Sequence, residues 1–212
     1  MSDLSRKTPV EPPPNRRARA KAEKRDRILA AARHALDTVG YEAMTMAQIA
    51  AAADVAAGTV FQYAATKPEL LMMVTADRWR GYPDVVADIP ESAPPAKAIR
   101  SVLDPLVASS LERPDTTLCV VRELLFGAPG PHRGEVVALV DDLEAGIARI
   151  LRQAGAGERA AMAAQLLVSG TLVDLNRTRE GRADPHTVGE RLDALIALVL
   201  TGSTSDRPAL TS

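Results

Sequence analysis

Two helix-start patterns in the N-terminal third of the chain constrain its fold more than any other feature. Residues 45–48 (Thr-Met-Ala-Gln) and 66–69 (Thr-Lys-Pro-Glu) both match a capping box, in which a threonine hydroxyl accepts a hydrogen bond from the backbone N–H three residues later and the Gln or Glu side chain reaches back. Between them, Asp54 tolerates the left-handed backbone of a tight turn. The patterns predict a short helix through Ala53, a second to about Tyr63, and a third from Thr66 to about Arg80.

Apolar residues recur at helical spacing along the rest of the chain. They trace one face of a helix from Lys21 to Val39, and Gly40 stands where that helix would end. No stretch shows the period-two alternation of a strand, and aromatic residues make up only 3% of the chain, which disfavours a sheet. The prediction is therefore an all-α fold. Further helices are expected at about 96–112, 116–126, 134–153, 158–180 and 187–201, after a Pro-rich connection at 81–95.

Composition places the chain among ordinary globular proteins, because its 212 residues are 46% hydrophobic and 25% charged. The single cysteine, Cys119, rules out a disulfide scaffold and a cysteine-based zinc cluster. No apolar run reaches the roughly 18 residues of a spanning helix, and no apolar stretch follows the basic N-terminal residues as in a secretory signal. We therefore expect a cytoplasmic protein with no membrane contact, no metal and no other cofactor.

Charge is distributed unevenly along the chain. Residues 1–33 hold ten basic and four acidic residues, a net charge of +6, whereas the remainder holds 16 basic and 23 acidic residues, a net charge of −7. A basic arm attached to a folded domain is typical of a protein that binds phosphate groups. A solvated N-terminus that only promotes solubility explains the same charge, and the charge alone does not separate the two.

A helix-turn-helix constellation lies within residues 28–71. Short helices joined by a tight turn give the geometry in which the second helix can lie in the major groove of DNA. Eight apolar residues are expected to pack the helices together: Ile28, Leu36, Ile49, Ala50, Ala53, Val55, Val60 and Phe61. The residues left facing outward are Ala56, Ala57, Thr59, Gln62 and Tyr63. Because Gln can pair with adenine, and Thr and Ala can contact a thymine methyl, this uncharged surface suits the reading of base edges.

The run from Thr45 to Leu70 resembles the DNA-binding signature of the TetR family of transcriptional regulators. The matching residues are Ile49-Ala50 before the turn, Val55 after it, Gly58-Thr-Val-Phe-Gln-Tyr63, and Thr66-Lys67 followed by Leu70. The resemblance covers about 45 residues, and the helical remainder fits the body of such regulators. Three residues depart from the family pattern: Asp54 stands where Gly is commonest, Ala56 where Ser often caps the helix, and Ala64 where Phe is usual.

The resemblance implies which residues contact DNA. Tyr63 and Lys67 are expected at phosphates, Thr45 near the backbone at a helix N-terminus, and Thr59 and Gln62 in the major groove beside Ala56 and Ala57. The free N–H groups at the starts of these helices suit phosphate binding. Because the outward-facing residues carry no charge, the arm is expected to supply much of the affinity. Its residues are Arg16, Arg17, Arg19, Lys21 and Lys24.

The last two helices carry more apolar surface than a chain of this length needs for its own core. The end of the helix expected at 187–201 is apolar nearly all round, which predicts burial on every side. A homodimer, in which these two helices from each subunit form a four-helix bundle, accounts for the surplus. The resemblance implies the same dimer and a palindromic operator, while a well-packed monomer core is the alternative. The expected interface residues are Leu166, Gly170, Val173, Leu192, Leu195 and Val199.

Regulators that this chain resembles usually hold a small molecule in the body. Methionine and tryptophan suit an adaptable apolar cavity, although Met and Leu at helical spacing also fit an ordinary core. The candidate lining residues are Met73, Trp79, Leu106, Cys119, Arg122, Phe126 and Asp174. The helix from Thr66 to Arg80 joins head and body, and is the natural lever between ligand and DNA.

The sequence thus predicts a flexible basic arm (1–20), a three-helix DNA-binding head (21–67), a larger helical ligand-binding and dimerisation body (68–201) and a disordered tail (202–212). The predicted function is a regulator, by resemblance a repressor, released from a palindromic double-stranded operator by a small, largely apolar effector. A DNA-binding regulator without an effector, controlled by protein partners, is the alternative. Catalysis is not expected, because the three histidines lack partners at metal-ligand spacing and the chain has no nucleophile elbow or phosphate loop.

Overall fold

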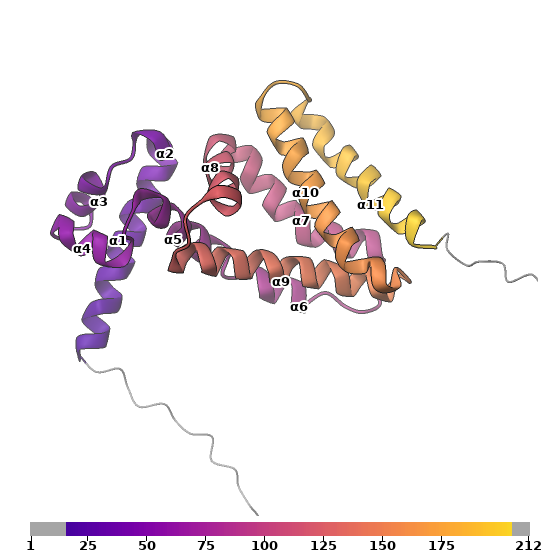
Figure 1. The fold of residues 1–212 in the computed structure, drawn as a ribbon, viewed down its shortest axis with the longest axis horizontal. Helices are drawn as coiled ribbons and strands as arrows, with labels where there is room; N and C mark the ends of the chain where they lie inside the picture. The colour runs from indigo at the N-terminus through magenta and orange to yellow at the C-terminus, as the bar shows by residue number, and fades with distance from the viewer. Residues whose placement is uncertain (1–15, 205–212) are drawn as a thin grey trace, which may run out of the picture.

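Helices form all the regular structure of residues 16–204, the part of the chain that the computed structural model describes (Figure 1). The α-helices are α1 (Arg16–Thr38), α2 (Gly40–Ala43), α3 (Met46–Ala52), α4 (Ala57–Tyr63), α5 (Lys67–Trp79), α6 (Tyr82–Ala87), α7 (Pro95–Glu112), α8 (Pro114–Phe126), α9 (Pro131–Gln153), α10 (Ala160–Arg179) and α11 (Val188–Thr204). Short 3-10 helices lie at Gly157–Arg159 and Pro185–Thr187. The all-α prediction is confirmed, while residues 1–15 of the expected arm and 205–212 of the expected tail lie outside the described residues.

Helices α1 to α4 form a small bundle, the head, at one end of the elongated molecule (Figure 1). Ile28, Ala32 and Leu36 of α1 are buried at the predicted helical spacing, because they share the face that packs on α3 and α5. Ile49 of α3 and Val60 of α4 join them in one hydrophobic cluster. The periodicity of the apolar residues therefore predicted this core well, with Phe61 as an exception described below.

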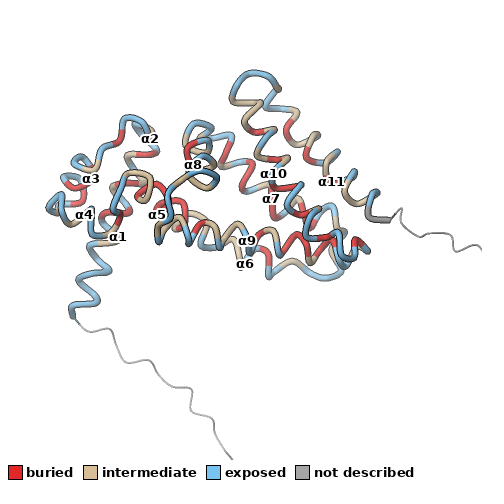
Figure 2. Tube along the Cα trace, viewed as in Figure 1, coloured by how far each residue is buried: buried red, intermediate tan, exposed pale blue. Residues whose placement is uncertain are grey.

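The first helix begins earlier than predicted. It begins at Arg16 rather than near Lys21, and residues 16–24 are exposed on a segment that projects from the bundle (Figure 2). Arg, Ala, Lys and Glu fill this segment and are all strong helix formers. Arg19 also pairs with Glu23 one turn later, with Nε 3.1 Å from Oε1. The expected boundary between arm and head at residues 20 and 21 therefore falls inside a helix.

Helix α5 joins the head to the rest of the chain, which we call the body. All seven residues from Leu70 to Ala76 are buried (Figure 2). The hydrophobic cluster of the head continues through α5 to Cys119 and Val120 of α8 and to Val136 of α9. The predicted boundary at residues 67 and 68 therefore crosses a continuous core, and a change in the body can reach the head through packed side chains.

The body is built on α9, which packs against α5, α6, α7 and α10. Helices α10 and α11 form an antiparallel hairpin beside α7 (Figure 1). Gly170 lets the two arms of the hairpin approach closely, since a Cβ there would lie 2.8 Å from Leu195 Cδ2. The body core includes Ile99, Ile147 and Leu167, which have no exposed side-chain surface.

The connection at 81–95 contains a helix that the sequence did not predict. Helix α6 has only six residues, and Gly81 before it, Pro83 in its first turn and Pro90 after it suggested a connection without a helix. Its Val86 is buried against α9, where a Cβ on Gly146 would lie 2.2 Å from Val86 Cγ1. The helix therefore forms because a tertiary contact, rather than local sequence, favours it.

Candidate nucleic-acid interface and ligand cavity

The turn between α3 and α4 has the geometry of a helix-turn-helix motif. Asp54 adopts the left-handed backbone that was predicted, with φ of 51°. The Asp54 N–H donates to Ala51 O (3.2 Å) and the Val55 N–H to Ala50 O (3.0 Å), the paired bonds of a Schellman motif. Arg27 of α1 also donates to the Asp54 carbonyl at 3.3 Å. That contact spans 27 residues, so no local pattern could have predicted it.

The two predicted capping boxes differ in the structure. Thr45 and Gln48 form a complete box: Gln48 N donates to Thr45 Oγ1 (3.2 Å), and Thr45 N donates to Gln48 Oε1 (2.9 Å). Thr66 likewise accepts from Glu69 N at 3.2 Å. The Glu69 carboxylate does not reach back, because it accepts instead from the backbone N–H groups of His132 and Arg133 at the start of α9. The second box was therefore only half right.

Helix α4 presents the outward-facing residues in nearly the predicted arrangement. Ala56, Ala57 and Gln62 are exposed, while Thr59 and Tyr63 are half-buried. Phe61, which was expected in the core, is 49% exposed. The reason is helical geometry: Val60 and Ala64, four residues apart, occupy the inward face, so the next position turns outward. Ala56 provides no side-chain cap for α4, as its sequence implied.

The two predicted phosphate contacts are both engaged within the chain. The Tyr63 hydroxyl donates to Lys21 O at 2.9 Å, which ties the end of α4 to α1. The Lys67 ammonium donates to Glu42 O at 2.9 Å and lies 4.6 Å from the centre of the Tyr41 ring. A DNA contact at either residue therefore exchanges a phosphate oxygen for an internal partner.

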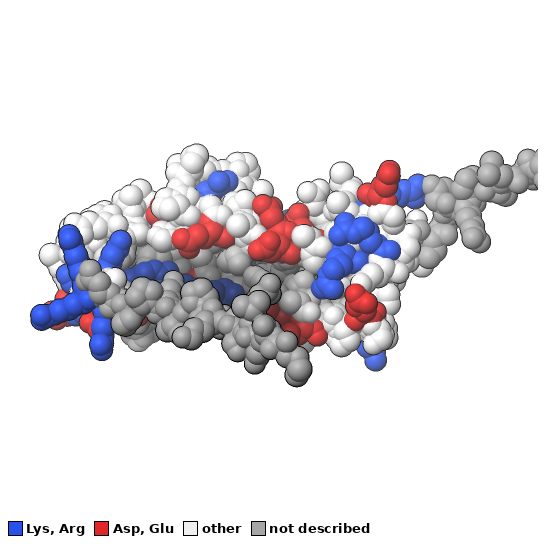
Figure 3. All heavy atoms as spheres, turned by 90° about the horizontal axis from the view of Figure 1, so that it is seen from below, with Lys and Arg blue, Asp and Glu red and all other residues white. Residues whose placement is uncertain are grey.

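Basic side chains gather on α1 beside this surface. Arg16, Arg17, Arg19, Lys21 and Lys24 are all exposed. In the view from below, Lys and Arg cluster at the head end of the molecule, acidic residues lie over its middle, and a second group of Lys and Arg lies further along the body (Figure 3). The structure thus places the predicted basic residues on the exposed first turns of helix α1, rather than on an arm without regular structure.

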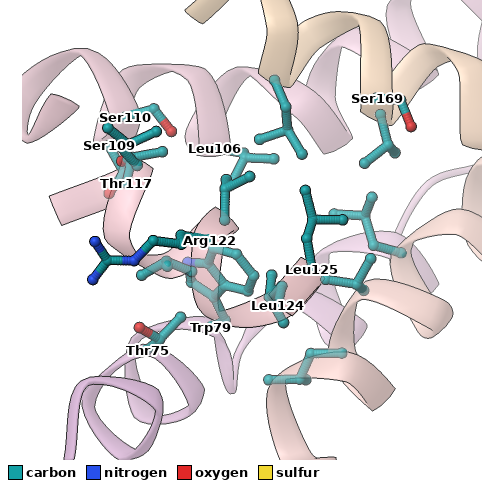
Figure 4. Close-up of a pocket in the computed structure, with 18 of the residues that line it drawn as sticks. Thr75, Trp79, Leu106, Ser109, Ser110, Thr117, Arg122, Leu124, Leu125 and Ser169 are labelled. Atoms are coloured by element: carbon teal, nitrogen blue, oxygen red, sulfur yellow. The ribbon is translucent and has the colours of Figure 1, made fainter. Parts of the chain in front are cut away.

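The body contains a cavity of about 750 Å³ lined by residues of α5 to α10. Of the predicted lining residues, Trp79, Leu106, Arg122 and Phe126 lie along it (Figure 4). The other three do not. Met73 is fully buried and Cys119 nearly so, both in the cluster shared with the head. Asp174 instead binds Arg191 of α11, with oxygens 3.0 and 2.5 Å from Nε and Nη2.

The cavity has distinct walls. Hydroxyl groups of Thr75, Ser109, Ser110 and Thr117 gather with Arg122 at one side, while Leu124 and Leu125 line the other (Figure 4). Sequence reasoning missed this hydroxyl cluster, because its members come from three helices. Burial raises the pKa of two titratable groups on the wall, Glu144 and Tyr82, the latter to about 12. Tyr82 therefore stays neutral at physiological pH.

The predicted interface residues fall into three groups. Leu166 and Val173 of α10 are exposed at 57% and 59%, although Val173 also borders the cavity. Leu192 is buried in the body core, and Gly170 serves the contact between α10 and α11, so these two were wrong as surface residues. Leu195 and Val199 are half-buried in the same contact. Helix α11 is not buried all round, since Leu198 is 68% exposed in the single chain.

The described residues contain neither a candidate metal site nor a helix that could span a membrane. Among residues 16–204, no His, Cys, Asp and Glu side chains group in threes that could hold a metal ion. In the same part of the chain, no helix is both long and apolar enough to cross a membrane.

The structure combines a helix pair joined by a tight turn, an exposed second helix of that pair, a basic first helix and an all-helical body. This is the arrangement of a helix-turn-helix regulator of transcription. The sequence model of a family described as bacterial regulatory proteins, tetR family, matches residues 28–72. The head of the chain is therefore similar to transcriptional regulators of the TetR family.

Relatives extend the similarity beyond the head. The transcriptional repressor KstR of Rhodococcus jostii strain RHA1 is 27% identical over 191 residues, which cover 89% of this chain and 88% of KstR. A repressor of this family from Thermus thermophilus, FadR in complex with lauroyl-CoA, has a TM-score of 0.66 at 23% identity and covers 89% of this chain and 98% of its own. A regulator from Rhodococcus sp. RHA1 has a TM-score of 0.65 at 22% identity, covering 88% and 98%. The two solved structures share the whole helical fold.

Proposed function

We propose that this protein is a repressor that binds a palindromic operator as a homodimer and leaves it when a small, largely apolar ligand occupies the cavity. The observation that carries the proposal is the outward surface of α4, which is exposed, uncharged and held behind a tight turn. Packing of the head does not require Gln62 and the half-exposed Phe61 to lie side by side at the surface. A helix that contacts base edges does present such residues.

The proposed DNA contacts divide into contacts with base edges and contacts with phosphates. Gln62 suits a bidentate contact to adenine, and Thr59, Ala57 and Phe61 suit thymine methyl groups. The basic face of α1 suits phosphates, which supply most of the affinity and all of its salt dependence. Thr45 at the start of α3 and Lys67 at the start of α5 lie where free helix N–H groups favour the same phosphates.

A second copy of the chain accounts for the exposed apolar residues on the hairpin of α10 and α11. Met162 and Leu166 lie one turn apart on α10 and are 62% and 57% exposed, and Leu198 of α11 is 68% exposed. A two-fold axis through this face would pair the four helices as a bundle and set two heads side by side. Two heads related by a dyad require an operator with the same symmetry.

The cavity supports a ligand of largely apolar character. Its volume lies in the range of small-molecule sites, and leucine, valine and one tryptophan line much of it. FadR, which shares the fold, holds lauroyl-CoA, and this supports a cavity that accepts an acyl chain. A ligand releases DNA only if it binds more tightly to the protein when the two heads are in the arrangement that does not fit DNA. Helix α5, which joins head and body, would transmit this change.

Selection from a pool of random duplexes tests the DNA part of the proposal. We expect enrichment of an inverted repeat, and weaker binding of it by Gln62→Ala. Gln153→Ala, at the far end of α9, is the matched control. If no sequence is enriched over random competitor, the chain does not bind DNA in this way.

Thermal shift with dodecanoic acid and lauroyl-CoA tests the ligand part. We expect a raised Tm and release of the selected duplex. Leu106→Trp, which fills the cavity, should abolish both effects, whereas Leu111→Trp on the same helix but off the cavity should not. If a broader panel of apolar compounds also fails to bind, the regulator has no small-molecule effector and responds to protein partners instead.

A further inference from the structure

The first turn of α9 touches the end of the recognition helix α4. His132 Nε2 lies 2.8 Å from the Tyr63 carbonyl oxygen, which belongs to the last residue of α4. A carbonyl only accepts, so this imidazole nitrogen carries the proton. The His132 side chain is 12% exposed, and His132 follows Tyr63 by 69 positions in the chain. The contact is therefore a partly buried hydrogen bond between body and head.

Glu69 makes a second tie at the same place. Its Oε2 accepts from His132 N at 3.1 Å, and its Oε1 accepts from Arg133 N at 3.2 Å. These N–H groups have no partner within α9 itself, because they belong to its first turn. The carboxylate also lies at the positive end of the helix dipole, which strengthens the bond. Gly130 leaves room for it, since a Cβ there would lie 2.2 Å from Glu69 Oε1.

Arg133 extends this joint to the cavity wall. Its guanidinium donates from Nε to Glu123 O at 2.9 Å and from Nη2 to Leu124 O at 2.6 Å. Both carbonyls belong to the last turn of α8, whose side chains Leu124, Leu125 and Phe126 line the cavity. In Figure 1, the start of α9 lies between the end of α8 and the start of α5.

We propose that His132 is a positioning residue that fixes the end of the recognition helix to the first turn of α9, that Glu69 of α5 holds this turn in place, and that Arg133 couples the turn to the cavity wall. A ligand that displaces the last turn of α8 then moves α4 through hydrogen bonds, beside the packed core around α5. The inference rests on the proposed function, because it names how occupancy of the same cavity reaches the same DNA surface.

The test measures amide hydrogen exchange in the full-length protein without DNA, so it does not depend on operator binding. His132→Leu removes the donor to Tyr63 and should speed exchange of residues 60–64 about tenfold. His132→Gln places an amide N–H near the same position and should restore the slow rate. His186→Leu, an exposed histidine remote from the joint, is the matched control, and exchange in α10 should stay unchanged in every variant.

The decisive step is a double-mutant cycle with Arg133→Met. The hydrogen bonds of Arg133 go to Glu69 and to α8 rather than to α4, yet its removal should speed exchange of residues 60–64 several-fold. In the His132→Leu background the same change should add nothing, because the two residues act in series. If Arg133→Met leaves α4 unaffected, or if the two effects add, the coupling does not exist.

Two further measurements distinguish failure of this inference from a folding defect and from failure of the proposed function. If His132→Leu does not fold, Gly130→Ala displaces the Glu69 carboxylate more gently and should also speed exchange in α4. On the selected duplex, His132→Leu should bind about tenfold more weakly and His132→Gln as the unmodified chain does. Faster exchange with unchanged DNA affinity would overturn the role in recognition, whereas failure of the duplex selection would overturn the proposed function and leave the exchange result standing.

Discussion

The head and the body present different surfaces to solvent. Among the described residues, the exposed large apolar side chains of the head are Val39 and Phe61. The body has nine, and several gather in two places: Leu125 and Phe126 at the cavity, and Met162, Leu166 and Leu198 on the outer face of α10 and α11. The head, with its basic α1, therefore exposes a largely polar surface that suits contact with DNA. The body keeps apolar surface that a ligand and a second copy can cover.

The largest effect is expected from the outer face of the body. Leu166→Glu combined with Leu198→Glu places two charges where the second copy would pack, so the chain should become monomeric. Affinity for the selected duplex should fall at least about 100-fold, because one head loses the help of the other. Sedimentation equilibrium and fluorescence anisotropy check both results.

Leu111→Glu is the control for that variant, because Leu111 is also a partly exposed leucine but lies on α7. It should remain dimeric. If the double variant stays dimeric as well, the second copy packs elsewhere, and the exposed apolar face of α10 and α11 is not the dimer interface.

Removal of charge from α1 should have the next largest effect. In Arg16→Gln combined with Lys21→Gln and Lys24→Gln, each lost phosphate contact should flatten the log–log salt dependence of binding by about 0.9, or roughly 2.7 for three contacts. Lys97→Gln combined with Arg152→Gln removes exposed charge from the body and should leave the slope unchanged. An unchanged slope in the α1 variant would mean that its charge serves solubility.

Neighbouring residues of α4 sharpen the comparison further. Phe61→Ala should weaken DNA binding about tenfold while changing the free energy of unfolding by less than about 0.5 kcal/mol, because the ring is half exposed. Val60→Ala should lower that free energy by roughly 1–3 kcal/mol, because Val60 is fully buried. Urea unfolding and anisotropy separate the two effects. A strongly destabilised Phe61→Ala would show that the ring belongs to the core after all.

The smallest effect concerns Tyr82 in the body. Burial raises its pKa to about 12, against an ordinary value of 10.0. Between these values the unfolded chain releases the proton and the folded chain keeps it, so this group's contribution to stability is present below pH 10 and is lost as pH rises toward 12. Tyr82→Phe should flatten that part of the pH profile of unfolding. A profile identical in both proteins would contradict the burial of the hydroxyl.

Local patterns predicted what depends on a few neighbouring residues. The Thr45 box, the left-handed Asp54 and the helix spacing of α1 all depend on contacts within one or two turns, and all are confirmed. The same reasoning placed Glu69 in its own helix cap, because sequence spacing cannot show that α9 arrives 63 residues later with free N–H groups. Contacts of that range decide which of two locally satisfactory arrangements forms.

The predicted sites follow the same division. The outward residues of α4 could be predicted because a seven-residue helix has few faces, and only Phe61 was assigned to the wrong one. The cavity lining could be predicted only in part, because Met73 and Leu106 look alike in sequence and differ only in what packs over them. Gly170 was likewise assigned to a contact between chains, when its own neighbour Leu195 uses the space.

The stoichiometry of the complex on DNA tests the central claim most directly. Sedimentation velocity of the full chain with the selected duplex should give two chains per duplex, and replacing one half of the inverted repeat should abolish tight binding. The half-sites should lie about one helical turn apart or a multiple of it, as the two-fold arrangement of heads requires. One chain per duplex, or binding that ignores the second half-site, would contradict the account.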